Sequence, residues 1–351
     1  MATALYRSHA PALAATHADL ENHASAQREI LVGTPGSVVV RRNATGTAFY
    51  ARQFYDHDGV KRDRYIAGPV GSPAAEALAE SWRTRIAEAN ELLVSVRILV
   101  REGYHAMAPK PFAAVAALAS SGLFAAGALL IGTHAFAAIV NRLGIRASAF
   151  PTEDIDIARP EALARASVPE GGFLGALRQS GIDFVPIPEF DPRTPSTKFK
   201  EAGRSRLHVY LLVPAEGREV TIRAVPELDA HATALPYLRY LLAESQPGIV
   251  LSRHGVAAVR TPLPERLALH KLLVSQLRTG RNEKSLKDLR QATVLVAALC
   301  DLFPGSLTEA FAALPATALK HVRKSLAQAM PSLEAHPAAL EEMAPLVAAK
   351  A

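Results

Sequence analysis

Two aspartates alternate with isoleucines in the short stretch TEDIDIA, residues 152–158. If this stretch is a β-strand, residues two apart project from one face with their Cα atoms about 7 Å apart. Asp154 and Asp156 then point one way, while Ile155 and Ile157 enter the core. Two carboxylates on one rigid face suit Mg²⁺, which shares its coordination between protein carboxylates and substrate phosphates. The alternative is a half-exposed strand whose outward positions are acidic.

The stretch upstream, ALLIGTHAFAAIV at 128–140, predicts an apolar strand, a Gly-Thr turn and a helix that begins near Thr133. A helix N-terminus offers unpaired N–H groups and the positive end of a dipole, and glycine lets a phosphate approach the backbone. The Thr133 hydroxyl could also donate to a phosphate, unless it only caps the helix. Gly132 and Thr133 are therefore candidate phosphate-binding residues.

These motifs recur in a known order. The stretch LFAAGALLIGTHAFAAIVNRLGI is followed by TEDIDIA, and then by PERLALHKLLVSQLR and KSLKDLRQA. This arrangement resembles the polymerase-β-like nucleotidyltransferase superfamily, and within it a bacterial branch of uncharacterised nucleotidyltransferase-domain proteins. The resemblance covers roughly residues 40–305.

The resemblance implies an enzyme that moves a nucleoside monophosphate from a nucleoside triphosphate (NTP) donor to a hydroxyl or phosphate acceptor, with Mg²⁺ or Mn²⁺ as cofactor. Two metal ions would neutralise charge on the α-phosphate and on the leaving pyrophosphate. Asp154 and Asp156 would be the catalytic metal ligands. Gly132 and Thr133 would hold the β- and γ-phosphates.

The later helices add cations. Lys271 and Arg278 are seven residues apart, so they share a helix face. The resemblance implies that Lys271 contacts the triphosphate or the base, and that Asp288 orients Lys271 or Lys287. The alternative is an ordinary solvated helix face with salt bridges.

The third carboxylate of the superfamily is missing. In the strand HVYLLVP, Tyr210 stands where the resemblance places an acid. Tyrosine is a poor Mg²⁺ ligand at neutral pH, because its pKa lies near 10. Either Glu227 or Asp229 substitutes, or turnover is low or lost. A degenerate protein that binds nucleotide or nucleic acid without transfer is thus the alternative function.

Net charge and the N-terminal hairpin indicate an anionic partner. The chain carries a formal net charge of +6. Residues 41–65 interleave tyrosines and a phenylalanine with basic residues, namely Arg41, Arg42, Arg52, Lys61, Arg62 and Arg64. Such a ribbon can hold a nucleic-acid backbone and stack bases, although a solvated hairpin packed on the protein explains the same pattern. Lys198 and Lys200 lie in a polar segment punctuated by prolines, which fits a loop at the mouth of a site, and from it they could also reach phosphates.

The alternation of predicted strands and helices favours a core of the α/β (α+β) class. The resemblance implies that this core is a nucleotidyltransferase core with a mixed sheet. We expect four parts: a flexible tail over 1–35, a basic β-hairpin and long-helix module over 36–120, the catalytic core over 121–235, and a helical C-terminal domain over 236–351. Ser72 and Pro73 are signals for the N-terminus of the long helix, which carries a sustained apolar stripe. Within the core we expect a buried strand at 123–132 and a short helix at 160–168.

The setting is expected to be cytoplasmic. The single Cys300 lies in an apolar run, which excludes a disulfide frame and a cysteine metal cluster. No Asp, Glu, Lys or Arg occurs between Lys110 and Arg142, so one membrane-inserted helix over 111–140 is an alternative. Glycines and polar residues interrupt this run, and no membrane partner is expected.

Overall fold

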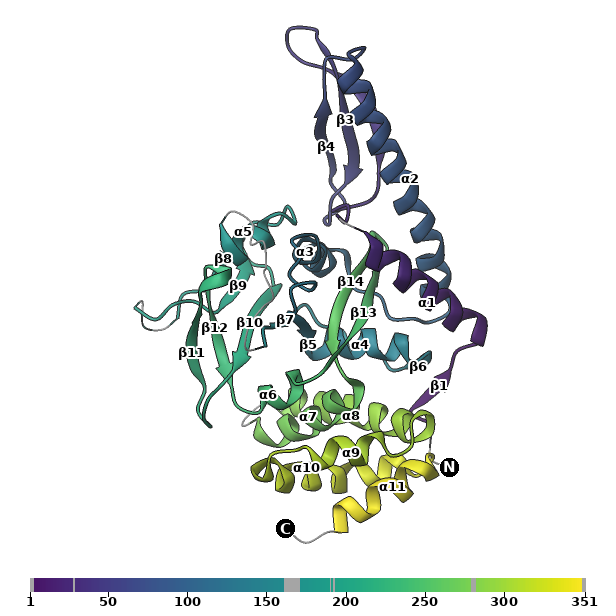
Figure 1. The fold of residues 1–351 in the computed structure, drawn as a ribbon, viewed down its shortest axis with the longest axis vertical. Helices are drawn as coiled ribbons and strands as arrows, with labels where there is room; N and C mark the ends of the chain where they lie inside the picture. The colour runs from purple at the N-terminus through teal and green to yellow at the C-terminus, as the bar shows by residue number, and fades with distance from the viewer. Residues whose placement is uncertain are drawn as a thin grey trace.

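The computed structural model describes residues 3–27, 29–160, 171–189, 191, 193–278 and 282–348. Figure 1 shows an elongated molecule with three levels: a strand-and-helix module at one end, a mixed sheet in the middle, and a layer of helices at the other end. The predicted mixed class of helices and strands is therefore confirmed. The short helix predicted at 160–168 lies outside the described residues, apart from its first position.

The N-terminal segment corrects the prediction of a flexible tail. Strand β1 (Tyr6–Ser8) pairs antiparallel with β6 (Ile145–Ala147), and helix α1 (Pro11–Ala26) follows it. Leu20 and Ala24 of α1 are buried against the long helix α2 (Pro73–Arg101) and the strand β14 (Gly255–Pro262). The short, alanine-rich pattern of α1 gave little periodicity, so burial of these two residues was not foreseen.

The module at the far end consists of an antiparallel sheet and one long helix. Strands β2 (Ser37–Arg42), β3 (Ala48–Tyr55) and β4 (Lys61–Ala67) pair in that order, and α2 (Pro73–Arg101) packs on them. The predicted N-terminus of α2 is confirmed, because the Ser72 side chain accepts a hydrogen bond from Ala75 N.

Arg52 differs from its expected place on a nucleic-acid-binding face. It is only 1% exposed, and its guanidinium donates to the backbone carbonyls of Val32, Thr34 and Pro35. Its ring partner is Phe54, at 4.2 Å from the guanidinium carbon to the ring centroid. Arg52 therefore holds the module together rather than facing a partner.

The stretch 111–140 does not form one membrane-inserted helix. It divides into α3 (Pro109–Ser120), a run of turns, β5 (Leu129–Ile131) and α4 (Gly132–Arg142). The strand expected over 123–132 is thus only three residues long, because glycines at both ends of LFAAGA favour turns. Among the described residues, we find no helix with the length and apolar character needed to cross a membrane.

The central sheet contains seven strands. Its main path runs β11 (Thr221–Val225), β12 (Ala230–Leu235), β10 (His208–Pro214), β7 (Ile155–Ala158) and β5. β7 and β10 are parallel, and β5 is antiparallel to β7. At its N-terminal half, β10 also pairs with β9 (Lys198–Glu201), which pairs with β8 (Phe184–Pro186).

Helices cover both faces of the sheet. Helices α3 and α5 (Gly172–Arg178) contribute to the core that contains Ile155 and Ile157. The other face, with Leu129 and Ile131, packs with α4 and with helices from the C-terminal part of the chain. Alternation along β5 and β7 thus assigns neighbouring residues to two different cores.

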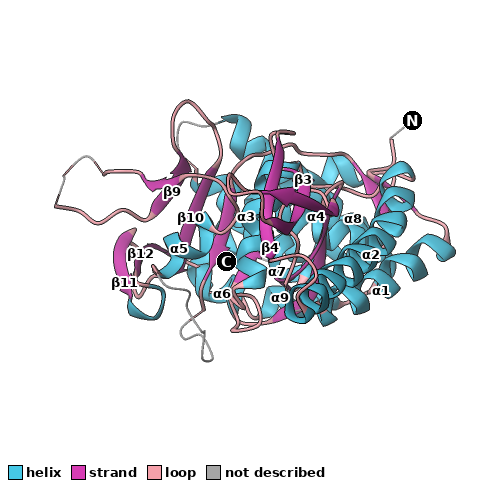
Figure 2. Cartoon of the chain, turned by 90° about the horizontal axis from the view of Figure 1, so that it is seen from above, coloured by secondary structure: helices cyan, strands magenta, loops and turns pink. Residues whose placement is uncertain are grey.

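The C-terminal part is mainly helical, as predicted, but begins with a hairpin. After α6 (Leu238–Leu242), strands β13 (Ser245–Ser252) and β14 (Gly255–Pro262) pair antiparallel. The remaining helices are α7 (Pro264–Leu277), α8 (Asn282–Leu302), α9 (Ser306–Ala312), α10 (Ala316–Ala329) and α11 (Pro337–Ala348). Seen from above, β9 to β12 lie on the opposite side of the molecule from α1 and α2 (Figure 2).

Candidate active site

Asp154 and Asp156 lie at the beginning of β7 on the face that turns toward the C-terminal helices. Ile155 and Ile157 are fully buried on the other face, whereas both aspartates are partly exposed. The alternation expected for TEDIDIA is therefore observed. Asp156 pairs in the sheet with Ile131, the last residue of β5. This register brings the end of β5 and the start of α4 beside the carboxylates.

Gly132 touches Asp156 closely. Its φ is +70°, and a Cβ built on it would lie 2.2 Å from Oδ2 of Asp156. Only glycine fits this position, because any side chain would collide with the carboxylate and would occupy a left-handed backbone conformation. The turn thus sets the Asp156 carboxylate directly against the start of α4.

The start of α4 carries no side-chain cap. Its N-cap residue is Ile131, whose side chain makes no capping hydrogen bond, so Thr133 is not an N-cap. The Thr133 hydroxyl instead accepts a 3.5 Å hydrogen bond from Nε2 of Gln291, a buried residue of α8. Uncapped N–H groups at a helix N-terminus favour an anion.

The two carboxylates differ in their electrostatic setting. Burial, and then the negative charge of Asp154, raise the pKa of Asp156 to about 6. The positive charges of Lys271, Arg278 and Lys284 oppose this rise. A carboxylate held where its ionised form is disfavoured gains when a cation binds it.

Lys271 and Asp288 form a buried ion pair between α7 and α8. Nζ of Lys271 donates to Oδ1 of Asp288 at 3.0 Å, and both side chains are less than 8% exposed. Nε of Arg278 lies 2.8 Å from Oδ2 of the same carboxylate. Burial alone would raise the pKa of Asp288, but the charges of Lys271 and Arg278 hold it below its ordinary value. Asp288 therefore positions two cations beside the acid pair.

Helix α8 presents one polar face to the site. Lys284, Lys287, Asp288 and Gln291 follow the spacing of one helix face. Nζ of Lys284 lies 3.4 Å from Oδ2 of Asp154. Burial lowers the pKa of Lys287, and the nearby Lys271 lowers it further. Cations from α7 and α8 thus converge on the two aspartates.

Tyr210 and His208 project from the neighbouring strand. Tyr210 of β10 pairs directly with Asp156 of β7, so the tyrosine stands beside the acid as the resemblance placed it. Two residues earlier on the same face, Nδ1 of His208 lies 3.5 Å from Oδ1 of Asp154. The strand that lacks the third carboxylate therefore brings an imidazole to the acid pair.

A comparison with protein families agrees with this geometry. The sequence profile of a nucleotidyltransferase family matches residues 111–315, more than half of the chain. The chain belongs to this nucleotidyltransferase family. The match begins in α3 and ends beyond α9, so it includes the acid pair, the glycine turn and the cations of α7 and α8. No curated protein and no solved structure matches the chain.

The two acids considered as replacements for the family carboxylate are directed elsewhere. Glu227, in the short helix η1 (Pro226–Leu228), forms an ion pair with Arg159, three residues beyond Asp156 along the chain. Asp229 caps the same short helix with a φ of 44° and lies beside Gly172 of α5. Within the described part of the chain, no hydrogen bond or ion pair joins either acid to Asp154 or Asp156.

The lysines expected in a loop lie on a strand instead. Lys198 and Lys200 belong to β9, where they pair with Tyr210 and His208 of β10. Nζ of Lys198 lies 3.3 Å from Glu189, and Lys200 donates to the carbonyl of Gly203 at 3.4 Å. The loop interpretation was wrong. The prolines around 188–195 favour a loop, but the short strand β9 begins directly after them.

Two residues of the site were missed from the sequence. His208 carries a signal, because it lies two residues before Tyr210 and so shares its strand face. Lys284 lies three residues before Lys287, which indicates that the two lysines share one helix face. The spacing does not predict which residues this face contacts. Only the packing of α8 on α7, with Gln291 of α8 hydrogen-bonded to Thr133 at the start of α4, brings Lys284 to Asp154.

Proposed function

We propose that the protein transfers a nucleoside monophosphate from an NTP to an acceptor hydroxyl or phosphate. The single observation that supports this most is the meeting of three features: an acid pair, an uncapped helix start at Gly132, and cations from α7 and α8. In the proposed reaction, the acceptor oxygen bonds to the α-phosphorus, and an acceptor hydroxyl loses its proton to water. At the same time the bond from the α-phosphorus to the oxygen that bridges the α- and β-phosphates breaks. Pyrophosphate then leaves with the bonding electrons.

The residues at the acid pair have the chemistry of metal ligands. Among the described residues, the ligand atoms of Asp154, Asp156 and His208 do not all lie within 4.8 Å of one another, so these side chains would move to close on an ion. Asp154 and Asp156 offer carboxylates from one face of the sheet, and His208 offers an imidazole nitrogen beside Asp154. A bound ion would neutralise charge on the α-phosphate and on the leaving group. Mg²⁺ strongly prefers oxygen ligands, whereas first-row transition ions accept imidazole more readily. We therefore infer that this site favours Mn²⁺ over Mg²⁺, with His208 as a third ligand.

The remaining residues bind and orient the triphosphate. The N–H groups at the start of α4 and the Thr133 hydroxyl would hold the β- and γ-phosphates. Lys284 lies at the mouth of the site and would move from Asp154 to a phosphate oxygen. Lys271 of α7 and Lys287 of α8 would add positive charge to the site, and Asp288 holds Lys271 in place.

Labelled NTPs test the proposal. The protein is incubated with each α-labelled NTP, Mg²⁺ or Mn²⁺, and a pool of cellular RNA and protein. We expect label transfer that is stronger with Mn²⁺, that is abolished by Asp154→Ala, and that is unchanged by Asp19→Ala, an exposed aspartate of α1. His208→Ala should reduce the preference for Mn²⁺. NTP binding without transfer under every condition would contradict an active enzyme.

A degenerate, non-transferring member of the family is the second candidate, because Tyr210 pairs with Asp156 where the family resemblance places an acid. The two candidates predict opposite results for Tyr210→Asp. A degenerate protein should gain transfer activity when the acid is restored. An active enzyme that uses His208 should keep its activity or lose part of it.

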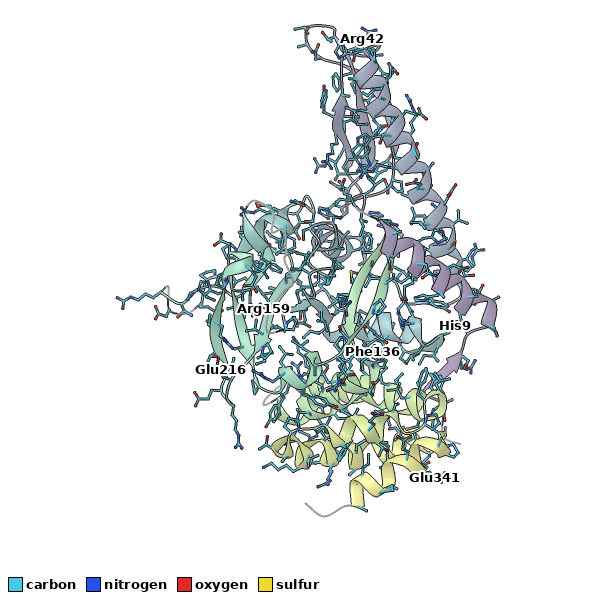
Figure 3. All side chains as sticks on the ribbon, in the orientation of Figure 1. His9, Arg42, Phe136, Arg159, Glu216 and Glu341 are labelled. Atoms are coloured by element: carbon cyan, nitrogen blue, oxygen red, sulfur yellow. The ribbon has the colours of Figure 1, made fainter. Side chains whose placement is uncertain are left out.

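Nucleic acid is the acceptor class that we propose, through the basic module. Lys61, Arg64, Tyr55 and Tyr65 are exposed there. Arg41 and Arg62 instead form ion pairs with Asp63 and Asp56. Arg42 marks the tip of the module, far from Phe136 in the core (Figure 3). A module that extends this far could hold a long polymer whose end enters the site.

Salt dependence tests this acceptor class. RNA binding through phosphates should weaken steeply between 50 and 200 mM salt, as expected when counterions are released (roughly 10³-fold or more for six or more phosphate contacts). The double variant Lys61→Ala, Arg64→Ala should flatten the dependence by about two phosphate contacts. A flat response in the wild-type protein would exclude the module as an RNA-binding surface.

A further inference from the structure

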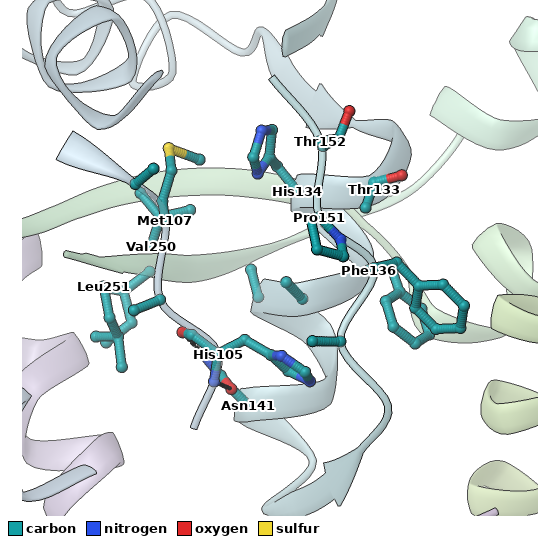
Figure 4. A pocket seen from close by; sticks show the side chains of 17 residues that line it. His105, Met107, Thr133, His134, Phe136, Asn141, Pro151, Thr152, Val250 and Leu251 are labelled. Atoms are coloured by element: carbon teal, nitrogen blue, oxygen red, sulfur yellow. Dashed lines mark hydrogen bonds between the residues drawn. The ribbon is translucent and has the colours of Figure 1, made fainter. Parts of the chain in front are cut away.

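A cavity of about 210 Å³ lies beside the acid pair. Its wall consists of residues 105–108, one side of α4, the segment 149–152, and residues 249–251 of β13 (Figure 4). The lining contains no Asp, Glu, Lys or Arg. It is formed mainly by alanines and larger apolar side chains such as Met107, Phe136 and Phe150. The cavity therefore suits an uncharged group.

One end of the cavity belongs to the proposed phosphate and metal site. Thr133, a lining residue, follows Gly132 at the start of α4. Thr152 also lines the cavity, and its hydroxyl accepts a hydrogen bond from Asp154 N at 3.2 Å. A molecule whose phosphates lie at Gly132 and Asp154 can thus extend an attached group into the cavity.

Two histidines, His105 and His134, add ring nitrogens to the polar groups of the lining. Figure 4 shows the ring of His134 near Thr152 and that of His105 near Asn141. Desolvation lowers the pKa of His134 to about 4 and also lowers the pKa of His105, so both rings are neutral at pH 7. Nε2 of each ring is buried without a protein hydrogen-bond partner among the described residues. A buried polar atom without a partner calls for a ligand or a water molecule.

The wall beside His105 is rigidly held. The Asn141 amide accepts from His105 N at 2.8 Å and donates to His105 O at 2.9 Å. The adjoining residue Met107 donates its N–H to Leu251 O at 2.7 Å. The segment 105–107 is thus fixed to α4 on one side and to β13 on the other, which keeps the cavity open.

We propose that this cavity binds the nucleobase ring of a substrate. The inference rests on the proposed nucleotidyl transfer, because it names the group that lies next to the phosphates. A cavity of about 210 Å³ is smaller than the ~300–1,000 Å³ sites that enclose a whole drug-sized ligand, so it takes one ring and not an entire nucleotide. Apolar walls cover the faces of the ring, and the two neutral imidazoles hydrogen-bond to its edge.

The base can come from the donor NTP or from a nucleotide acceptor. A variant whose larger side chain fills the cavity distinguishes these two sources. Ala137 lines the cavity from α4 and is partly exposed, so Ala137→Leu fills the space with little change elsewhere. Ala87→Leu, at an exposed position of α2, is the control. Calorimetry then measures the binding of NTPs, of tripolyphosphate, and of the four nucleosides to each protein in the presence of Mn²⁺.

If the donor base occupies the cavity, wild-type protein binds one NTP at least tenfold more tightly than tripolyphosphate. Ala137→Leu removes this difference and leaves tripolyphosphate binding unchanged. If an acceptor base occupies the cavity, a nucleoside binds to the tripolyphosphate-saturated wild-type protein, and Ala137→Leu abolishes that binding. In either case His134→Leu changes which base is preferred, and Ala87→Leu has no effect.

Equal effects of Ala137→Leu and Ala87→Leu on every ligand would overturn the assignment. Failure of the proposed function gives a different result: tripolyphosphate with Mn²⁺ would not bind to the wild-type protein at all. A third result is that tripolyphosphate binds, but the affinities for nucleosides and NTPs do not respond to Ala137→Leu. That result would reject the cavity as the base site and would leave the proposed function standing.

Discussion

At the scale of single residues, Asp156 is held in a setting that disfavours its charge. Its pKa of about 6 lies above the ordinary value of 3.8 because of burial and because of Asp154. Since one pKa unit corresponds to about 1.4 kcal/mol, ionising Asp156 in the folded protein costs on the order of 3 kcal/mol. Such a cost is typical of a group that is poised for a cation or for a reaction.

Asp156→Asn should therefore stabilise the metal-free protein at neutral pH. A raised pKa in the folded state means that stability is fully present below about pH 4 and is lost as pH rises through about 6. The asparagine remains uncharged, so it avoids this loss. Urea unfolding should give a variant that is up to roughly 3 kcal/mol more stable at pH 7.5 and nearly equal to wild type at pH 4.

A metal titration supplies the control for Asp156→Asn. Mn²⁺ should raise the unfolding midpoint of the wild-type protein at pH 7.5 and should affect the variant much less, because a ligand that binds only the folded state stabilises it. A variant less stable than wild type at pH 7.5 would show that the carboxylate is favourably paired without metal.

Gly132→Ala should abolish transfer activity. The new methyl group would lie against Oδ2 of Asp156 and displace the carboxylate, so we expect at least a hundredfold loss of turnover and of Mn²⁺ affinity. Gly122→Ala separates this clash from backbone strain, because Gly122 has a similar φ of +80° with no atom within 4 Å of its Cβ position. Both variants should lose about 1–3 kcal/mol of stability, but Gly122→Ala should keep its activity.

The acid pair and the glycine turn could be found from the sequence because their signals are local. Alternating acids and isoleucines fix one strand face, and glycine between an apolar strand and a helix fixes the turn. His208 was overlooked because its meaning depends on the register of β10 against β7. That register joins residues more than 50 positions apart, and no local pattern encodes it.

At the scale of elements, α7 and α8 act as one unit through Asp288. The Asp288 carboxylate is buried between Lys271 of α7 and Arg278, the residue that follows the last turn of α7. The resemblance implied that Asp288 orients Lys271 or Lys287, and the hydrogen bond that the carboxylate accepts comes from Lys271. The substrate contacts of Lys271 stay a prediction.

Asp288→Asn should weaken both the fold and the binding of NTP. Removing one partner of a buried pair leaves Lys271 charged without compensation, which typically costs about 3–5 kcal/mol. Urea unfolding measures this cost, and calorimetry with tripolyphosphate measures the binding. Glu283→Gln, an exposed acid on the same helix, should change neither quantity. A stable Asp288→Asn protein with normal tripolyphosphate binding would contradict the positioning role.

Long elements were predicted better than short ones. The 29-residue helix α2 has a serine cap and a sustained apolar stripe, so its start and length were foreseen. The hairpin of β13 and β14 was missed within a stretch expected to be helical, and β5 was predicted too long. Short apolar runs satisfy both helix and strand patterns, and only their packing partners decide between them.

At the scale of the whole molecule, the N-terminal segment joins the three levels. Tyr6 of β1 donates its hydroxyl to Asp301 of α8 at 2.6 Å, and Leu5 N donates to His336 near the C-terminal helix. Helix α1 then packs against α2 and β14. This segment was expected to be a flexible tail because its partners lie from about 70 to more than 300 residues away along the chain, where sequence patterns give no signal.

Leu20→Ala tests whether α1 belongs to the folded core. Leu20 is only 2% exposed and packs in the cluster that contains Leu93 and Leu99 of α2. Truncating a buried leucine typically costs about 2–5 kcal/mol, so urea unfolding should show a loss of this size. The control is Asn22→Ala, at an exposed position of the same helix, which should change the free energy of unfolding by less than about 0.5 kcal/mol. A Leu20→Ala protein as stable as Asn22→Ala would show that the segment is a tail after all, and that α2 and β14 are held together without it.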